Sequence, residues 1–235
     1  MELIARVVSV RRATPSARIV RVALDSAVFS YLAGQAVMLA PEGSRERVPY
    51  SIASAPEETA TDRTLEFLIK HDGDGRWGSD FAPLRRGARL ALCGPMGAFT
   101  FPRRPREHAF LFIAGGTGIA PLRSMLRHTL GQRDRTDPRL SVLYSARTPD
   151  DFAYGSELRR LARRGLISLV LTATRQSARG WRGGRGRIAR QDLALLLDEA
   201  ATLCFVCGPA SMVADVPVIL QELGIERTRI RIQEW

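Results

Sequence analysis

The 235-residue sequence is poor in the residues on which several protein classes depend. Three cysteines are too few for a disulfide framework or for a four-cysteine iron–sulfur site. The three histidines have no spacing that would join them in a metal site, and they are His71, His108 and His128. We therefore expect a cytoplasmic protein that is kept reduced and holds no metal ion.

Long apolar runs are missing as well. No segment approaches the ~18 consecutive apolar residues of a transmembrane helix. The first residues, Met1–Val8, alternate like a strand and lack the charged head and apolar core of a signal peptide. These absences predict a protein without a membrane segment and agree with a cytoplasmic location.

Positive charge dominates the sequence. The formal net charge is +11, yet Lys70 is the only lysine among 35 basic residues, and asparagine does not occur. Such a skew is typical of a coding bias, and the arginines are spread along the chain without the aromatic interleaving of a nucleic-acid surface. The sequence therefore argues against a nucleic-acid partner, whereas its charge favours an acidic protein as partner.

The first hundred residues have the pattern of β-structure. Runs rich in apolar and β-branched residues alternate with turn residues such as Thr14-Pro15-Ser16. One brief helix is expected at 79–84, and the expected strands are 2–10, 17–24, 36–40, 48–54, 64–70 and 88–93. Six short strands at this spacing predict a small six-stranded antiparallel Greek-key β-barrel.

From about residue 109 onward, strands alternate with helices. The expected strands are 109–114, 140–145, 167–173, 203–207 and 229–233, and the expected helices are 119–130, 155–164, 190–200 and 210–223. Five strands joined by crossover helices predict a doubly wound five-stranded parallel sheet, the α/β architecture of nucleotide-binding domains. The polar, proline-punctuated segment 101–107 is the expected link, which gives domains 1–102 and 103–235.

The most informative stretch of the sequence is a glycine turn. Ala109–Ala114 is a continuous apolar run typical of a strand buried on both faces, and Gly115-Gly116-Thr117-Gly118 follows at once. Pro121 then falls in the first turn of the expected helix. This order aims backbone N–H groups and the positive end of a helix dipole at one spot, which suits a phosphate. Taken alone, the pattern fits equally a tight strand-to-helix turn without a ligand.

Five motifs occur in a fixed order along the two expected domains. They are Val48-Pro-Tyr-Ser-Ile-Ala-Ser54, Gly75-Arg-Trp-Gly-Ser-Asp80, Gly94-Pro-Met-Gly-Ala-Phe99, Gly115-Gly-Thr-Gly-Ile-Ala-Pro121 and Cys207-Gly-Pro209. Together they resemble the ferredoxin–NADP reductase superfamily, also called the flavin reductase family, over essentially the whole chain. The resemblance implies that the barrel binds FAD and that the second domain binds NADPH or NADH. It also implies that hydride passes from nicotinamide to flavin before electrons leave singly for an acceptor.

The resemblance assigns several barrel residues to the flavin. Tyr50 would lie flat against the isoalloxazine ring, Ser51 would place its hydroxyl beside the flavin nitrogen that receives hydride, and Ile52 belongs to the same motif. Gly78 and Ser79 would face the FAD pyrophosphate, because Ser79 can cap a helical turn. The alternatives are an ordinary strand serine at position 51 and a cap without a ligand at position 79.

One position departs from the flavin motif. The family usually carries an arginine two residues before the tyrosine to hold the pyrophosphate, but here Val48 stands at that position and Arg47 precedes it. On a strand, a shift of one residue moves a side chain to the opposite face. Arg47 thus serves the phosphate if a bulge intervenes, and otherwise another group replaces it. Weaker FAD binding, or FMN as the bound flavin, stays open.

The resemblance assigns the pyrophosphate of the nicotinamide cofactor to Gly115–Gly118. Cys207, with Gly208 and Pro209 after it, stands at the carboxyl end of the fourth parallel strand, where open α/β sheets bind ligands. There it would lie beside the nicotinamide. Cys204 and Cys207 also spell C-x-x-C, but a strand places them on different faces, so the pattern does not favour a redox dithiol or a metal site.

The segment after the third parallel strand favours NADPH over NADH. Thr174 and Arg175 match the Ser-Arg pair of NADP-dependent relatives, and Arg185 matches their second arginine. Arg187 stands where those relatives often stack a tyrosine on the adenine. No acidic residue occurs from 172 to 190 to meet a bare ribose. A solvated arginine loop in an arginine-rich protein, with NADH as the cofactor, is the alternative.

The last residues of the sequence match a gate over the flavin. Several relatives end a terminal strand in an aromatic ring that covers the flavin face opposite the tyrosine, and Trp235 stands at that position. Glu234 matches the carboxylate that relatives place near the nicotinamide. The alternative is an edge strand whose last residues fray.

The sequence therefore predicts an FAD-dependent reductase with Ser51, Cys207 and Glu234 as its catalytic residues. It would take hydride from NADPH, or from NADH, and pass electrons to a separate acceptor such as an acidic ferredoxin or flavodoxin. The alternatives are a reductase of free flavin or other small acceptors, an electron-transfer subunit of a larger oxidoreductase, and a nucleotide-binding regulatory module without flavin.

Overall fold

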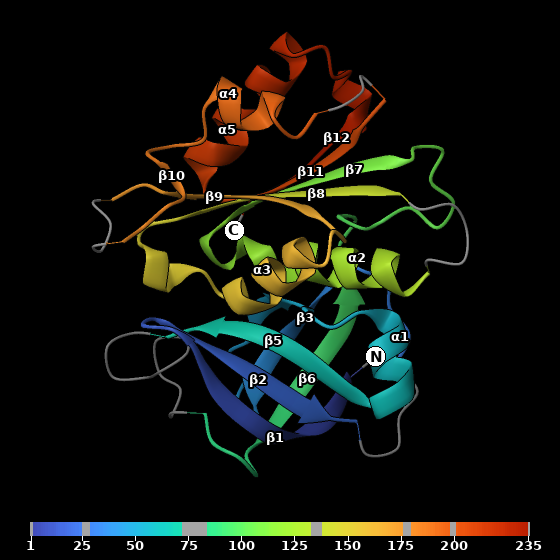
Figure 1. Cartoon of the computed structure of the whole chain (residues 1–235). Helices are drawn as coiled ribbons and strands as arrows, with labels where there is room; N and C mark the ends of the chain where they lie inside the picture. Colours follow the sequence, from blue (N-terminus) through green and yellow to red (C-terminus); the bar gives the residue numbers. More distant parts are fainter. Residues whose placement is uncertain are drawn as a thin grey trace. The chain divides into compact units, whose positions relative to one another are not determined.

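The computed structural model describes residues 2–24, 29–71, 84–132, 138–175, 180–197 and 201–234 (Figure 1). The chain forms two compact units. The barrel unit comprises Met1–Phe101 and Arg123–Gly131, and the sheet unit comprises Pro102–Leu122 and Gln132–Trp235. Helix α2 (Ile119–Gly131) therefore gives its first turn to the sheet unit and the rest of its length to the barrel unit. None of the helices in the described ranges is long and apolar enough to cross a membrane.

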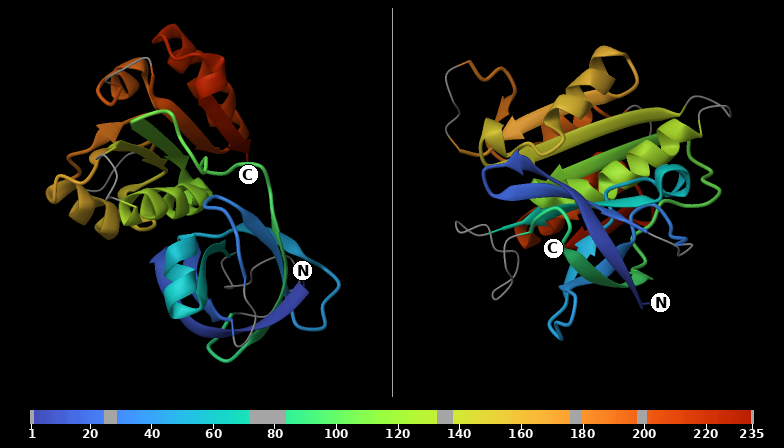
Figure 2. Two further views of the ribbon diagram at one scale, coloured as in Figure 1. Left: turned by 90° about the vertical axis from the view of Figure 1, so that its right-hand side faces the viewer. Right: turned by 90° about the horizontal axis from the view of Figure 1, so that it is seen from below.

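Six antiparallel strands form the barrel, in the order β4-β3-β6-β1-β2-β5. They are β1 (Glu2–Thr14), β2 (Ala17–Ala23), β3 (Ala36–Pro41), β4 (Val48–Ser51), β5 (Thr64–Lys70) and β6 (Arg89–Met96). A bridge between Ile52 and Phe67 joins the two ends of this sheet, and the strands curl into a ring (Figure 2, left). β6 pairs with β3 and β1 rather than with β5, which is the crossover of a Greek key. The predicted six-stranded antiparallel barrel is confirmed.

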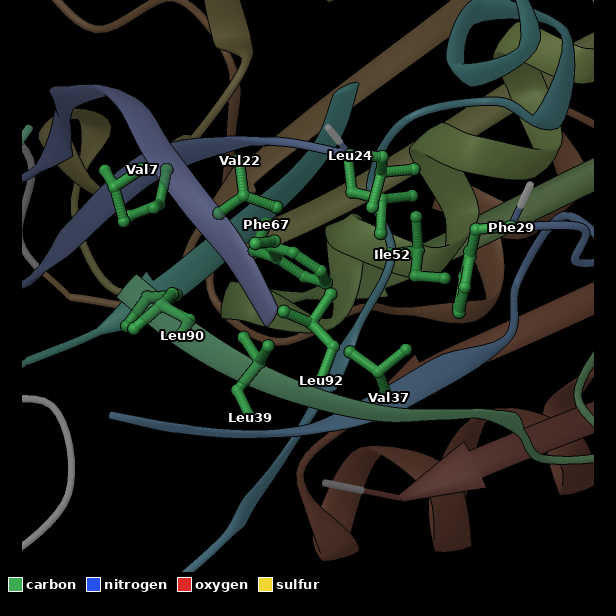
Figure 3. Close-up of a cluster of buried hydrophobic side chains, with 14 of the residues drawn as sticks. Val7, Val22, Leu24, Phe29, Val37, Leu39, Ile52, Phe67, Leu90 and Leu92 are labelled. Carbon is green, nitrogen blue, oxygen red and sulfur yellow. The ribbon is translucent and has the colours of Figure 1, made fainter. Parts of the chain in front are cut away.

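Apolar residues alternate along these strands, and their inward-facing side chains fill the barrel. Val7, Val22, Leu39, Phe67 and Leu92 come from five different strands and meet in one cluster (Figure 3). Each of these side chains is fully buried. Because burial of one large apolar side chain stabilises a fold by about 1.5–3 kcal/mol, this cluster supplies the main driving force for the barrel.

The helix α1 (Pro56–Asp62) is absent from the sequence-based prediction. Pro56 opens it, and the acidic Glu57 and Glu58 fall in its first turn, where they oppose the helix dipole. A carboxylate oxygen of Glu58 accepts a hydrogen bond of 2.8 Å from the backbone N–H of Ala55. The helix ends at Arg63, whose backbone is left-handed. The predicted helix at 79–84 lies outside the described residues.

The second sheet is parallel throughout, in the order β10-β9-β8-β7-β11-β12. Its strands are β7 (Ala109–Gly115), β8 (Arg139–Ala146), β9 (Ser168–Ala173), β10 (Gly184–Arg185), β11 (Leu203–Gly208) and β12 (Ile230–Glu234). Its helices are α3 (Gly155–Arg163), α4 (Arg190–Ala194) and α5 (Ala210–Glu222). Figure 1 shows α4 and α5 on one face of this sheet and α3 on the other. The predicted doubly wound sheet is confirmed.

Two details of that prediction are wrong. The sheet has a sixth strand, β10, whose two residues carry no recognisable hydrophobic pattern. The predicted helix 190–200 is too long, because α4 ends at Ala194. Leu193 and Leu196 are buried and Leu195 is 76% exposed, which is the spacing of an amphipathic helix, and for this reason the sequence predicts a longer helix than the structure has.

Replacing Phe67 with alanine should lower the free energy of unfolding by about 3–5 kcal/mol, because it empties a fully buried position at the seam of the barrel. Urea unfolding followed by circular dichroism measures the loss. Ile4, an exposed residue of the same barrel, is the matched control, and Ile4→Ala should cost about 1 kcal/mol or less. Equal losses in the two variants would contradict the packing of Phe67.

Candidate functional site

The sheet unit has a topological switch point between β7 and β11. From β7 the chain continues through β8 and β9 on one side, and later returns to β11 and β12 on the other. In open α/β sheets, ligands bind at the carboxyl ends of the strands at such a point. Gly115 ends β7, Gly208 ends β11, and Cys207 pairs with Ala114 one residue earlier.

A cavity of about 410 Å³ opens at this edge of the sheet. It lies over the carboxyl ends of β7, β8, β9 and β11 and beside the first turns of α5. Its lining consists of Gly115, Gly116, Ser145, Ala146, Arg147, Thr174, Arg187, Ile188, Pro209, Ser211, Met212, Asp215 and Val216. Four of these residues, Gly115, Gly116, Thr174 and Pro209, belong to the site that the sequence predicts.

Bare backbone forms one wall of the cavity. A Cβ atom on Gly115 would lie 2.8 Å from both Pro209 Cδ and Met212 Sδ, and 3.4 Å from the Cα atom of Gly208. A Cβ atom on Gly208 would lie 2.9 Å from Met212. The missing Cβ atoms therefore let the start of α5 pack closely against the two strand ends, and Gly115 also lines the cavity.

The glycine turn after β7 forms a short 3-10 helix, Gly116–Gly118, that runs directly into α2. Gly116 has a φ of +54°, which favours glycine. The hydroxyl of Tyr144, on β8, donates a hydrogen bond of 2.9 Å to the Gly116 carbonyl. Burial raises the pKa of Tyr144, so its hydroxyl stays a donor. Thr117 and Gly118 belong to this turn but do not line the cavity.

The start of α5 provides a second helix N-terminus at the cavity. Pro209 precedes the helix, and its carbonyl accepts a 2.8 Å hydrogen bond from the Met212 N–H. Pro209, Ser211 and Met212 all line the cavity. Two helix N-termini, those of the glycine turn and of α5, thus border one cavity, and the positive ends of their dipoles favour an anionic ligand.

Basic side chains gather at the β8 and β9 side of the cavity. Thr174 is held at the sheet edge by a 2.9 Å bond from its N–H to the Ala146 carbonyl. Arg147 follows β8 directly, and Arg187 lies beyond β10; both line the cavity. The Arg187 guanidinium is 3.9 Å from the carboxylate of Asp215, and both side chains are largely exposed.

The two arginines that the sequence predicts for the 2′-phosphate, Arg175 and Arg185, do not line the cavity. Arg175 is exposed at the end of β9 and bonds through its N–H to the Arg147 carbonyl, whereas its side chain does not line the cavity. Arg185 pairs with Ala173 in β10 and does not line it either. Sequence reasoning missed Arg147 and Asp215. Arg147 stands two residues after the predicted strand 140–145, and that position was a signal that could have found it.

Cys207 and Glu234 also lie at this sheet edge. The strand register sets Gln233 beside Cys207 and Glu234 beside Gly208. Glu234 is exposed, whereas Cys207 is buried, and burial raises the pKa of its thiol to about 12. Cys207 is therefore neutral near pH 7 and can pack against a ligand but cannot act as a thiolate.

Cys204 lies on the opposite face of β11 from Cys207. It packs in the core with Leu111, Leu193 and Leu220, and burial raises its pKa to about 12 as well. The strand predicted for this C-x-x-C sequence is confirmed. Among the described residues, no group of three or more His, Cys, Asp or Glu side chains could hold a metal ion.

The flavin motif lies on β4 in the barrel unit. Val48 and Tyr50 pack against the barrel core, while Ile52 is fully buried just after the strand. Burial raises the pKa of Tyr50 to about 12, so its phenol is neutral at physiological pH. Ser51 is half-buried and pairs with Ala36 at the strand end. An apolar, half-exposed aromatic ring next to a hydroxyl fits one face of a planar ring system.

Arg47 precedes β4 rather than lying on it. The register of β3 with β4 runs from Leu39 opposite Val48 to Ala36 opposite Ser51 without a bulge. The alternation of the strand therefore does not fix the direction of Arg47. Three further predicted site residues, Gly78, Ser79 and Trp235, lie outside the described residues.

Comparisons with known proteins match both halves of the chain. Residues 5–101 match the oxidoreductase FAD-binding domain, and residues 112–217 match the oxidoreductase NAD-binding domain. Ferredoxin–NADP reductase B of Sorangium cellulosum is 35% identical over 244 residues, which cover 98% of this chain and 96% of that protein.

Two further similar proteins are longer than this chain. The glycine betaine monooxygenase reductase subunit of Chromohalobacter salexigens is 30% identical over 206 residues, and the match spans 85% of this chain but 54% of that protein. The solved structure of the ferredoxin reductase in carbazole 1,9a-dioxygenase superposes with a TM-score of 0.81 at 28% identity. That superposition covers 100% of this chain and 69% of the other.

Two of the three thiols should resist alkylation in the native protein. Burial holds Cys204 and Cys207 as neutral thiols, with pKa values of about 12, so their thiolate fraction stays minute from pH 7 to pH 9. Cys93 is only half-buried. Titration with a chromogenic disulfide at pH 8 should count one fast thiol and then three in urea. Three fast thiols without urea would contradict the burial of β11.

Proposed function

This chain belongs to the ferredoxin–NADP reductase family of flavin-dependent oxidoreductases, and on that premise we propose that it oxidises NADPH and delivers the electrons to a separate acidic carrier protein of the ferredoxin or flavodoxin type. It is an FAD- and NAD(P)H-dependent oxidoreductase with an FAD-binding and an NAD-binding domain. The FAD-binding role belongs to domain 1–102 and the NAD(P)-binding role to domain 103–235, a division supported by the two matched ranges.

The observation that carries the proposal is the cavity at the switch point. Gly115 and Gly116 present backbone without side chains to this cavity, which suits a pyrophosphate, and two helix N-termini favour its charge. Gly116 lines the cavity at the start of the glycine turn, while Thr117 and Gly118 stay in the proposal as donors of N–H groups on the strength of the sequence motif. Cys207, Gly208, Pro209 and the carboxylate of Glu234 border the nicotinamide end.

Charge at the other end of the cavity supports NADPH as the preferred donor. Arg147, Arg187 and Thr174 offer two guanidinium groups and a hydroxyl to a 2′-phosphate. Asp215 offsets part of that charge through its pair with Arg187, and a carboxylate is also the group that accepts a hydrogen bond from a bare ribose. Arg175 and Arg185, exposed close by, add to the positive potential. NADH is thus a weaker substrate for the same site.

The barrel residues fit a flavin. FAD, when bound, supplies a centre that accepts two electrons as hydride and releases them one at a time. Tyr50 offers a neutral aromatic face, and Ser51 a hydroxyl that can hold one edge of the ring in place. Ile52 keeps this strand end dry, and Arg47 contributes charge toward the phosphates. Gly78, Ser79 and Trp235 stay in the proposal on the strength of the sequence motifs.

The chain's own contribution to the reaction is mostly positioning. Cys207 is neutral, so it packs beside the nicotinamide without competing as a nucleophile. Holding two reacting rings in contact converts a bimolecular step into a unimolecular one, which can lower the barrier by about 7–11 kcal/mol. Ser51 supplies a polar contact for the flavin ring, and Glu234 supplies one for the nicotinamide.

The net charge of +11 supports an acidic protein as the electron acceptor. Opposite charges speed the encounter of two proteins, and salt weakens that effect. Ferredoxin–NADP reductase B of Sorangium cellulosum matches this chain over nearly its full length. A second candidate role, as the reductase of an oxygenase, is favoured by the likeness to two oxygenase-associated reductases, although this chain spans only part of each.

Steady-state assays test the acceptor. NADPH oxidation is measured with an acidic ferredoxin, a flavodoxin, free FMN and an uncharged quinone at 20 and 300 mM salt. For a carrier protein, kcat/KM should fall by about tenfold or more at the higher salt, while the rate with quinone should change little. Faster turnover with free FMN than with either carrier, at both salt concentrations, would identify a flavin reductase instead.

Binding of two nucleotide fragments tests the assignment of NADPH. Arg147→Gln should weaken 2′,5′-ADP by about tenfold, since one charge-assisted contact to phosphate is lost, and should leave 5′-AMP within about twofold. Asp215→Asn should strengthen 2′,5′-ADP by a few fold, because Arg187 loses its competing partner. Isothermal titration calorimetry measures the dissociation constants of both fragments for the wild type and for the two variants.

Arg160, an exposed arginine of α3 that does not line the cavity, provides the control. Arg160→Gln removes the same charge and should leave both fragments unaffected. If Arg147→Gln weakened 2′,5′-ADP and 5′-AMP equally, Arg147 would not recognise the 2′-phosphate.

A further inference from the structure

A buried ion pair lies behind the flavin motif in the barrel unit. The Arg123 guanidinium is 3.2 Å from a carboxylate oxygen of Glu66, and both side chains are only 10% exposed. Arg123 belongs to the part of α2 that is counted with the barrel unit, and Glu66 lies on β5. Arg21 and Arg11 on neighbouring strands approach Glu66 to 3.8 and 3.9 Å.

The same arginine binds the backbone that follows β4. Its Nη1 atom donates a hydrogen bond of 2.7 Å to the Ala53 carbonyl, and Ser124 Oγ donates one of 2.7 Å to the Ser54 carbonyl. From the opposite direction, the Tyr31 hydroxyl donates a bond of 2.9 Å to the same Ser54 carbonyl. Residues 53 and 54 are thus held by side chains more than 20 positions away in the sequence.

These two residues also form the seam that closes the barrel. The Ala53 N–H donates to the Glu66 carbonyl at 2.8 Å, and the Glu66 N–H donates to Ser54 Oγ at 3.1 Å. Ala53 follows Tyr50, Ser51 and Ile52 without a break. The network therefore fixes the backbone of residues 53 and 54, which directly follow the flavin motif residues 50–52.

Stability alone does not account for this pair. Burying two charges costs several kcal/mol each, and an apolar pair of similar volume is often as stable or more so. What the guanidinium adds is direction, because its Nη1 atom donates to the Ala53 carbonyl while it lies 3.2 Å from Glu66 Oε1, so that one nitrogen is held between the two groups. The contact thus specifies a backbone position more than it stabilises the fold.

We propose that Arg123 is a positioning residue for the flavin. Acting through Ala53 and Glu66, it fixes the segment 50–52 and so sets the place of the Tyr50 ring and the Ser51 hydroxyl. The proposal rests on the flavin site assigned above and adds a residue outside the flavin motifs.

A double variant separates positioning from stability. Arg123→Met with Glu66→Met replaces the pair with apolar side chains of similar length, and should keep the urea midpoint close to that of the wild type, because Arg21 retains its pair with Asp62. In the purified holoprotein it should raise the FAD dissociation constant about tenfold and change the visible circular dichroism of the flavin. Arg123→Lys keeps the positive charge but places it on a different head group, so its FAD affinity should lie between those of the wild type and the double variant.

Arg127, one turn further along α2, is the matched control. It pairs with Glu58 of α1. Arg127→Met should leave FAD affinity and the flavin spectrum as in the wild type. A double variant with wild-type affinity and spectrum would overturn the role of Arg123. A wild-type protein that binds no flavin would overturn the proposed function as well.

Discussion

The close approach of two strand ends is the constraint on which the sheet unit depends. β7 and β11 are buried along their length, and the stacked rings of Phe112 and Phe205, 5.5 Å apart, hold them side by side. Where they end, no Cβ atom fits on Gly115 or Gly208. The hydrophobic core thus brings two glycines together, and Met212 and Pro209 fill the space that their side chains would take, so that the start of α5 packs against both strand ends and borders the cavity.

In the barrel, closure and the flavin motif share one seam. The bridge of Ile52 with Phe67 joins the two ends of the sheet, and the next two residues are held by Glu66 and by helix α2. The strand that presents Tyr50 and Ser51 cannot shift without opening the barrel. The scaffold therefore transmits its rigidity directly to the proposed site, which is what a reaction that depends on positioning needs.

The sequence predicted which segments form strands and helices better than it predicted which residues of different elements lie close together. Strands such as 109–114 and 203–207 are recognisable because continuous burial leaves a continuous apolar run. The helix α1 was missed because Ala55, at its start, has no capping side chain. The only sequence signals for its first turn are Pro56 and the two glutamates. Arg147 and Asp215 were missed for another reason. They meet Thr174 and Arg187 only because β8 lies beside β9 and because α5 starts at the same sheet edge, and periodicity carries no information on strand order.

The division of α2 between the two units has a consequence for synthesis of the chain. The barrel unit is discontinuous, because its last piece, Arg123–Gly131, follows the first strand of the sheet unit. A ribosome that has released residues 1–101 has therefore not yet supplied the helix that binds Ala53 and Ser54. The seam can be completed only when β7 and the glycine turn have also emerged. The barrel unit therefore cannot finish folding before synthesis of the sheet unit has begun. Recombination that exchanges one unit between relatives would have to carry this helix segment along.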